Sequence, residues 1–403
     1  MSSAGKRKLV LEDGQVYIGD AFGADGERIL ELVFNTSMVG YQEILSDPSY
    51  TDQAVVMTYP LIGNYGMADD DYESLKPTIG ALVVREYNDE PSNFRSTRTL
   101  GEVMKQYGIV GLSGVDTRKL ARSVRDYGSR LALLTDAETP LAECLSKLRE
   151  YTVPTDAVSR VSTKEEYVSE AVKCGKCEAA SGNTLAPSEA AAPLHVVAID
   201  CGMKQNIVRS LNRRGCKVTV VPWNTSAEII LSKNPDGVFI SNGPGDPTDV
   251  PETIETIRNL IGKKPIFGIC LGHQILSLAF GAKTYKLKFG HRGGNHPVKE
   301  LASGKIEITS QNHSYAVDLS SLSNTPLAAT HINLLDNTVE GVSCKEKQAF
   351  SVQYHPESAP GPQDSSYLFD RFINLMRTGE LSDSRKPEQA AVCAADPCGK
   401  EAM

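Results

Sequence analysis

The sequence has no apolar run that approaches the roughly 18 residues needed to cross a membrane. Its longest apolar-rich stretch, residues 265–282, is interrupted by His273 and Gln274. The N-terminal segment MSSAGKRKLVLEDG is basic but contains no apolar segment of signal-peptide length. We therefore expect no membrane partner and, by default, a cytoplasmic location.

The sequence also lacks an excess of positive charge and a dense set of cysteines. Its 42 Lys and Arg residues are outnumbered by 50 Asp and Glu, which gives a net charge of -8 and argues against nucleic acid as a partner. Nine cysteines in 403 residues are too few for a disulfide-stapled fold, so we interpret them as thiols in a reducing compartment. The 40% of hydrophobic residues is typical of a globular protein, and the length predicts two or three domains.

Composition and periodicity divide the chain into four parts. Residues 1–150 contain short strand patterns and a few helices, typical of a mixed, β-rich α/β domain. Residues 151–193 form a connecting segment that ends in a small, polar linker from Cys174 onwards. Residues 194–380 alternate apolar strands with helices and then, from residue 284, contain shorter β-like pieces; this predicts a mostly parallel sheet flanked by helices. Residues 381–403 are polar and predict a disordered tail.

The most informative segment surrounds Cys270. An apolar strand pattern runs into Gly268-Ile-Cys-Leu-Gly272, and a helix pattern begins at once, which is the pattern of a nucleophile elbow with cysteine in place of serine. The free N–H groups and dipole at a helix start favour the thiolate form, and the N–H of Leu271 would point toward an oxyanion. Taken alone, the motif is equally compatible with a buried structural cysteine.

A thiolate that transfers acyl groups needs a proton carrier, and His355 is the best placed of the seven histidines. It follows the apolar strand pattern AFSVQY, which would deliver it to the carboxyl edge of a parallel sheet. Glu357 lies two residues later, across the rigid Pro356, and could orient the imidazole. Alone, His-Pro-Glu is more often a surface loop. We interpret His273, in the first turn of the helix after Cys270, as structural.

A third loop, SNGPGDP at residues 241–247, also follows a strand pattern. Its backbone N–H groups would be exposed at the strand end, and Gly243 could provide a second oxyanion donor beside Leu271. A phosphate-binding loop is the alternative. The spacing of the glycines matches neither a P-loop nor a dinucleotide fingerprint, which disfavours it.

Together these three segments resemble the class I, triad-type glutamine amidotransferases. The quoted motifs are GICLGHQ at 268–274, SNGPGDP at 241–247 and HPE at 355–357. Five more segments resemble the small, glutamine-hydrolysing subunit of carbamoyl-phosphate synthetase: FNTSMVGYQEILSDPSY (34–50), YPLIGNYG (59–66), GVDTRKL (114–120), KFGHRGGNHPV (288–298) and TSQNHSYAV (309–317). The resemblance extends from about Leu9 to Met376.

The resemblance implies both a reaction and a partner. Cys270 would attack the side-chain amide of L-glutamine, with the oxyanion held by the N–H groups of Leu271 and Gly243. His355, oriented by Glu357, would protonate the departing ammonia and then activate the water that hydrolyses the thioester. Ammonia would pass to a large partner subunit, in a heterodimer or higher heteromer, that makes carbamoyl phosphate from bicarbonate and two ATP for arginine and/or pyrimidine biosynthesis. No cofactor is implied in this chain, because ATP and Mg are expected on the large subunit.

The resemblance also implies the residues that contact L-glutamine. They are Ser49, Gly243, Gly245, Leu271, Gln274, Asn312, Ser314 and Tyr315. Ser49 would reach the site from the N-terminal domain, which would also form the interface with the large subunit. The family commonly has glycine and phenylalanine where this sequence has Ser314 and Tyr315, and we expect altered detail rather than lost activity.

Three alternatives remain open at this point. Cys174, Cys177, Cys393 and Cys398 could on paper bind zinc, but no histidine or second C-x-x-C supports them, and we predict no metal site. A noncatalytic regulatory subunit would need no intact triad. A stand-alone thiol hydrolase of another amide would show no coupling of glutamine turnover to a large subunit and ATP.

Overall fold

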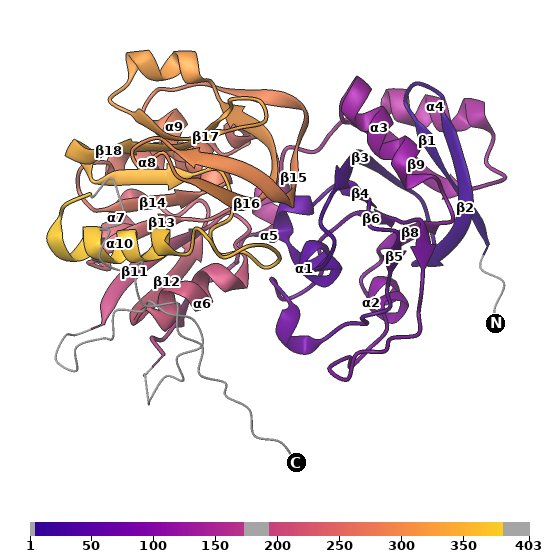
Figure 1. Cartoon of the computed structure of the whole chain (residues 1–403), viewed down its shortest axis with the longest axis horizontal. Coiled ribbons are helices and arrows are strands. Elements are labelled where there is room, and N and C mark those ends of the chain that lie inside the picture. Colours follow the sequence, from indigo (N-terminus) through magenta and orange to yellow (C-terminus); the bar gives the residue numbers. More distant parts are fainter. Residues whose placement is uncertain (1–4, 173–192, 382–403) are drawn as a thin grey trace.

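The computed structural model describes residues 5–172 and 193–381, which form two sheet-based units that lie side by side (Figure 1). The predicted linker lies outside the described residues except for Pro193, and so does the predicted tail from residue 382 onwards. The cysteines weighed as zinc ligands, at positions 174, 177, 393 and 398, are likewise outside them. No helix in the described ranges is both long and apolar enough to cross a membrane.

The N-terminal unit is a closed barrel of mixed strand direction. Its strand order is β1-β2-β8-β6-β4-β3-β9. The bounds are β1 Lys6–Leu11, β2 Val16–Gly23, β3 Arg28–Asn35, β4 Gln53–Met57, β6 Ala81–Val83, β8 Val110–Ser113 and β9 Arg130–Asp136. A separate two-stranded sheet pairs β5 (Leu61–Ile62) with β7 (Glu86–Tyr87). The mixed, β-rich character predicted for this part of the chain is confirmed.

Short helices cover the barrel. They are α1 Tyr41–Ser46, η1 Pro48–Tyr50, η2 Asp69–Asp71, α2 Leu100–Gln106, α3 Thr117–Tyr127 and α4 Leu141–Glu150. Helices α2 and α3 begin at strong caps: Thr99 forms a capping box with Glu102, and the Asp116 side chain accepts from the N–H of Lys119. Helix α1 has no side-chain cap, whereas η1 is capped by Asp47 and carries Ser49.

The C-terminal unit is built on a ten-stranded sheet, which α5 (Ala157–Val161) precedes. The strand order is β10-β12-β11-β13-β14-β19-β18-β16-β15-β17. Its parallel centre comprises β11 Leu194–Asp200, β12 Cys216–Pro222, β13 Gly237–Ile240, β14 Ile266–Ile269 and β19 Ala349–Val352. Antiparallel strands extend it: β10 Tyr167–Ser169, β15 Thr284–Glu300, β16 Ile306–Val317, β17 Ala328–Asn333 and β18 Val339–Cys344.

Helices cover both faces of the parallel centre, as predicted. They are α6 Gln205–Arg213, α7 Ala227–Ser232, α8 Pro251–Leu260, α9 Leu271–Ala279 and α10 Tyr367–Thr378, with short η3 Pro247–Asp249, η4 Leu319–Asn324 and η5 Lys345–Lys347. Along β13, Phe239 packs in the core beneath α6 and α10, whereas Val238 and Ile240 pack in the core beneath α7, α8 and α9. Burial on both faces explains why these strands are continuously apolar in the sequence.

The region after residue 283 differs from the prediction of short β pieces. Strands β15 and β16 are 17 and 12 residues long. Their pairing shifts register between Lys286 and His291 and again between Gly293 and His296. These irregularities bend β15 without ending it, and they interrupt the alternation that would have marked one long strand in the sequence.

Candidate active site

Cys270 occupies a strained turn between β14 and α9. It has φ 54° and ψ -105°, a backbone conformation that non-glycine residues rarely adopt, and α9 begins at the next residue. Gly272 permits this turn because a Cβ at that position would lie 2.2 Å from the carbonyl oxygen of Ile240. The predicted nucleophile elbow is therefore present, and its strain sits at the predicted nucleophile.

The thiol of Cys270 is buried and faces strand β16. Its Sγ lies 3.4 Å from the carbonyl oxygen of Asn312, and only 2% of the residue is exposed. Leu271 follows as the first residue of α9, where the helix has no preceding turn to accept its N–H. Gly243 packs against the same elbow: a Cβ there would lie 2.8 Å from Cδ2 of Leu271. The two predicted oxyanion donors thus lie on adjoining segments.

His355 and Glu357 form a buried pair just beyond β19. Nδ1 of His355 lies 2.6 Å from Oε1 of Glu357. Burial lowers the pKa of His355, but the charge of Glu357 and the neighbouring Cys270 outweigh it and raise the pKa to about 10. Nε2 of His355 is buried with no hydrogen-bond partner in the described part of the chain. Cys270 is thus close enough to contribute to the raised pKa of the ring.

Lys204, at the N-cap of α6, is a member of the site that the sequence analysis missed. Its Nζ lies 3.0 Å from Oε1 of Glu357, and both side chains are buried. Burial raises the pKa of Glu357, but Lys204 and then His355 oppose it and lower the pKa to about 2. Lys204 therefore keeps Glu357 ionised. The available signal was its position: like Cys270, it follows a parallel strand at the carboxyl edge of the sheet.

All the predicted glutamine contacts line one pocket together with Cys270. The lining residues are Ser49, Gln53, Gly243, Gly245, Cys270, Leu271, Gln274, Arg292, Asn312, His313, Ser314 and Tyr315. Ser49 on η1 and Gln53 on β4 come from the N-terminal unit, and the others come from the C-terminal unit, including Leu271 and Gln274 on α9. The pocket is therefore closed by both units.

Hydrogen bonds hold the walls of this pocket in place. Nε2 of Gln274 donates to the carbonyl oxygen of Tyr315 at 2.8 Å, which ties α9 to β16. Nη2 of Arg292 donates to Oγ of Ser314 at 2.5 Å. The hydroxyl of Ser314 is thus an acceptor within the wall, and its effect on glutamine binding stays a prediction.

Asp47 joins the barrel to the sheet beside the pocket and was also missed. Its carboxylate accepts from the N–H of Ser49 at 2.9 Å and from Nδ2 of Asn312 at 3.0 Å. Nδ2 of Asn242 lies 3.4 Å from the same carboxylate and donates to Oγ of Ser49 at 2.9 Å. Ser49 and Asn312 are therefore positioned by one shared acceptor.

His273 lies where the sequence analysis placed it, away from the acid–base pair. Its ring is fully buried, and Nδ1 lies 2.9 Å from Oγ of Ser351 on β19. Burial lowers its pKa to about 3, so the ring is neutral. A larger cavity lined by β17, β18 and α10 contains none of the predicted site residues. We place the chemistry at Cys270, because the nucleophile and the proton carrier meet there.

Comparison with known families agrees with this geometry. Residues 197–375 match the model of class-I glutamine amidotransferases, which assigns the C-terminal unit and its thiol pocket to that class. Residues 9–134 match the CPSase domain of the carbamoyl-phosphate synthase small chain. The chain belongs to the carbamoyl phosphate synthase small chain family, in which the amidotransferase domain is the glutaminase component.

The relatives cover nearly the whole chain. A carbamoyl phosphate synthase small chain from Staphylococcus epidermidis is 54% identical over 92% of this chain and 96% of its own length. The protein of that name from Fusobacterium nucleatum is 53% identical over 91% and 97%. A carbamoyl phosphate synthase pyrimidine-specific small chain from Halalkalibacterium halodurans is 52% identical over 93% and 98%.

Proposed function

We propose that this chain hydrolyses L-glutamine at Cys270 and supplies the ammonia to a large carbamoyl phosphate synthase subunit. The observation that carries the residue assignment is the buried row of Cys270, His355, Glu357 and Lys204 beside a pocket built from both units. Lys204 faces Glu357 and Glu357 faces His355, so the raised pKa of His355 leaves an imidazolium beside the Cys270 thiol.

The reaction follows from the protonation states of this row. The Cys270 thiolate attacks the side-chain carbonyl carbon of glutamine, and the N–H groups of Leu271 and Gly243 hold the oxyanion. Because the pKa of His355 is raised, its imidazolium is ready to protonate the departing ammonia. The ring, now neutral, accepts a proton from water, which hydrolyses the γ-glutamyl thioester and releases glutamate.

The partner follows from the family. Relatives are named small chains, so we propose a heteromer with a large subunit that carries ATP and Mg and makes carbamoyl phosphate. Residues 1–150 would supply the interface and Ser49, residues 194–380 the glutaminase, with 151–193 and 381–403 as connection and tail. The pyrimidine-specific name of one relative supports pyrimidine biosynthesis as one destination, beside arginine. Reduced cysteines such as buried Cys144 fit a cytoplasmic location.

Replacement of the nucleophile in the assembled complex tests the proposal. Cys270→Ser should abolish glutamine-dependent carbamoyl phosphate synthesis, while synthesis from added ammonia stays close to the unmodified level. Cys144→Ala is the matched control, because Cys144 is a buried thiol on α4 of the barrel and should retain both activities. Loss of both activities in Cys270→Ser would show damaged assembly, and retention of both would refute the role of Cys270.

A stand-alone hydrolase would differ from a synthase subunit in one respect: its glutamine hydrolysis would not depend on the large subunit. We expect glutamine hydrolysis to rise when the large subunit, ATP and bicarbonate are all present. Equal turnover with and without them would favour an independent amidase.

A further inference from the structure

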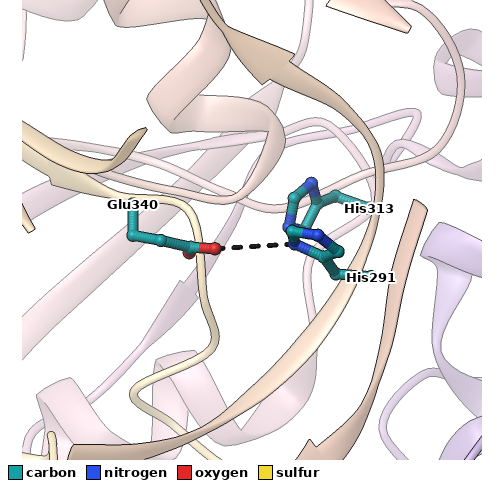
Figure 2. A group of neighbouring side chains, drawn as sticks. All are labelled: His291, His313 and Glu340. Atoms are coloured by element: carbon teal, nitrogen blue, oxygen red, sulfur yellow. Dashed lines mark ion pairs between the residues drawn. The ribbon is translucent and has the colours of Figure 1, made fainter. Parts of the chain in front are cut away.

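A second buried cluster of polar side chains begins at the lining of the glutamine pocket, to which His313 belongs. It comprises His291 on β15, His313 on β16 and Glu340 on β18 (Figure 2). One ligand atom from each lies within 4.8 Å of the other two, and all three residues are buried. His291 and His313 are direct cross-strand partners. None of the three has a role in the glutaminase row described above.

In His313, one ring nitrogen has a hydrogen-bond acceptor and the other has none. Nδ1 of His313 lies 2.7 Å from the carbonyl oxygen of Tyr315, which can only accept, so this nitrogen carries the proton. Nε2 of His313 then presents a lone pair, and it is buried without a hydrogen-bond partner among the described residues. His313 itself is 5% exposed. An unpartnered, buried lone pair next to a second imidazole and a carboxylate calls for a ligand.

His291 is oriented in the same way. Its Nε2 lies 2.8 Å from Oδ2 of Asp336, to which it donates. Its Nδ1 lies 3.6 Å from Oε1 of Glu340 and 3.5 Å from Nδ2 of Asn333, an amide nitrogen that can only donate. Histidines that bind metals typically donate their other ring N–H to a carboxylate or a backbone carbonyl, which is what both rings do here.

Glu340 is held by donors of its own. Its Oε1 accepts from Nδ2 of Asn333 at 2.9 Å, and its Oε2 accepts from Nε2 of Gln311 at 2.9 Å. The side chain is fully buried, so both of its oxygens are fixed in place beside the two imidazole rings.

We propose that Nδ1 of His291, Nε2 of His313 and the carboxylate of Glu340 bind one divalent transition-metal ion, with Zn²⁺ as the best chemical match. Two imidazoles and a carboxylate are a typical zinc donor set, which leaves the fourth position to water. Donor atoms about 2.0–2.2 Å from a common ion lie about 3.5 Å apart, so the cluster must contract by roughly 1 Å. The ring of His296 lies 5.1 Å from that of His291, centre to centre, and its Nδ1 is buried without a hydrogen-bond partner in the described ranges.

The ion would brace the pocket wall rather than take part in the reaction. His313 lines the glutamine pocket together with Asn312 and Ser314, whereas Glu340 lies on the neighbouring strand β18. A bound ion would therefore fix β15 and β16 to β18. This metal site departs from the sequence analysis, which considered only cysteine ligands.

Titration of the metal-free full chain with Co²⁺ alone tests the site. The chain should carry serine at positions 174, 177, 393 and 398, so that these thiols cannot bind the metal. We expect one equivalent of Co²⁺ with the visible d–d absorption of a four-coordinate nitrogen and oxygen site, displaced by Zn²⁺, and a higher melting temperature with the ion. Absence of such a spectrum at Co²⁺ concentrations up to the millimolar range would overturn the proposal.

Two variants separate this site from adventitious binding. Glu340→Gln preserves the size of the side chain and removes the carboxylate ligand. It should weaken Co²⁺ binding by at least about 100-fold, because replacement of a residue that only hydrogen-bonds to a metal ligand already costs about 10–100-fold. Glu300→Gln is the control, because Glu300 is a buried carboxylate on β15 that pairs with Arg371. This change should leave the affinity for Co²⁺ unchanged. Equal Co²⁺ binding by the unmodified and Glu340→Gln chains would place the metal elsewhere and refute the assignment.

Discussion

At the scale of single residues, the candidate site is a buried row in which Cys270 is followed by the oppositely charged His355, Glu357 and Lys204. His355 and Glu357 are identifiable from the sequence because they stand two residues apart at the end of one strand. Lys204 is 153 residues away from Glu357 and becomes visible only when parallel strands bring their carboxyl ends together. A buried lysine is costly unless it is paired, so its presence beside Glu357 shows how firmly that carboxylate is held in its charged form.

Replacement of Glu357 by glutamine should change the pH dependence of the thiol. Without the carboxylate charge, the raised pKa of His355 falls, so the imidazolium is lost at a lower pH than the value of about 10 in the unmodified chain. A smaller fraction of the rings beside Cys270 is then protonated. Alkylation of Cys270 by iodoacetamide at neutral pH should therefore slow, and its rate should rise only at higher pH. A pH–rate profile identical to that of the unmodified chain would show that Glu357 does not act on His355.

At the scale of secondary-structure elements, the strand–turn–helix around Cys270 matters most. The glycines and apolar residues of this segment are local signals, which is why the elbow is predictable from the sequence. The positions of α1, η1 and Asp47 are not, since they depend on packing between distant segments. The two register shifts in β15 were missed for a related reason, because a bulge breaks the alternation from which strands are recognised.

Gly272→Ala tests the elbow as a structural element. The added Cβ would meet the backbone oxygen of Ile240 at 2.2 Å, and backbone cannot move aside as a flexible side chain can. We expect a loss of about 1–3 kcal/mol in the free energy of unfolding, together with a large fall in glutamine hydrolysis. Gly281→Ala is the control for an added methyl group, because nothing lies within 4 Å of its Cβ position, although its φ of 95° also carries strain. A Gly272→Ala chain with unchanged hydrolysis would mean that the turn is not needed.

At the scale of the whole molecule, the barrel and the ten-stranded sheet share one pocket. Asp47 on the barrel side accepts from Asn312 on the sheet side, and Ser49 accepts from Asn242. Neither unit alone therefore encloses the predicted glutamine contacts. This shared construction agrees with the family comparison, in which the two family models match successive parts of one chain.

Asp47→Ala should weaken this junction without touching the thiol. Loss of the carboxylate leaves the amide of Asn312 without its acceptor, at a cost of about 1–3 kcal/mol for a buried donor. We expect the KM for glutamine to rise about tenfold or more, with ammonia-dependent synthesis by the complex preserved. Asp126→Ala on exposed α3 is the control, because its neighbour Arg125 forms only a surface pair with it. An unchanged KM in the Asp47→Ala chain would exclude this role of the junction.

The most direct test of the central claim is to trap the covalent intermediate. Complex turning over glutamine is quenched in acid, digested and analysed by mass spectrometry for a γ-glutamyl group on the peptide that contains Cys270. The proposed chemistry predicts that mass increase on Cys270 and none in a Cys270→Ser chain. Turnover with the glutamyl group on a different residue, or with unchanged glutamine-dependent activity in Cys270→Ser, would contradict it.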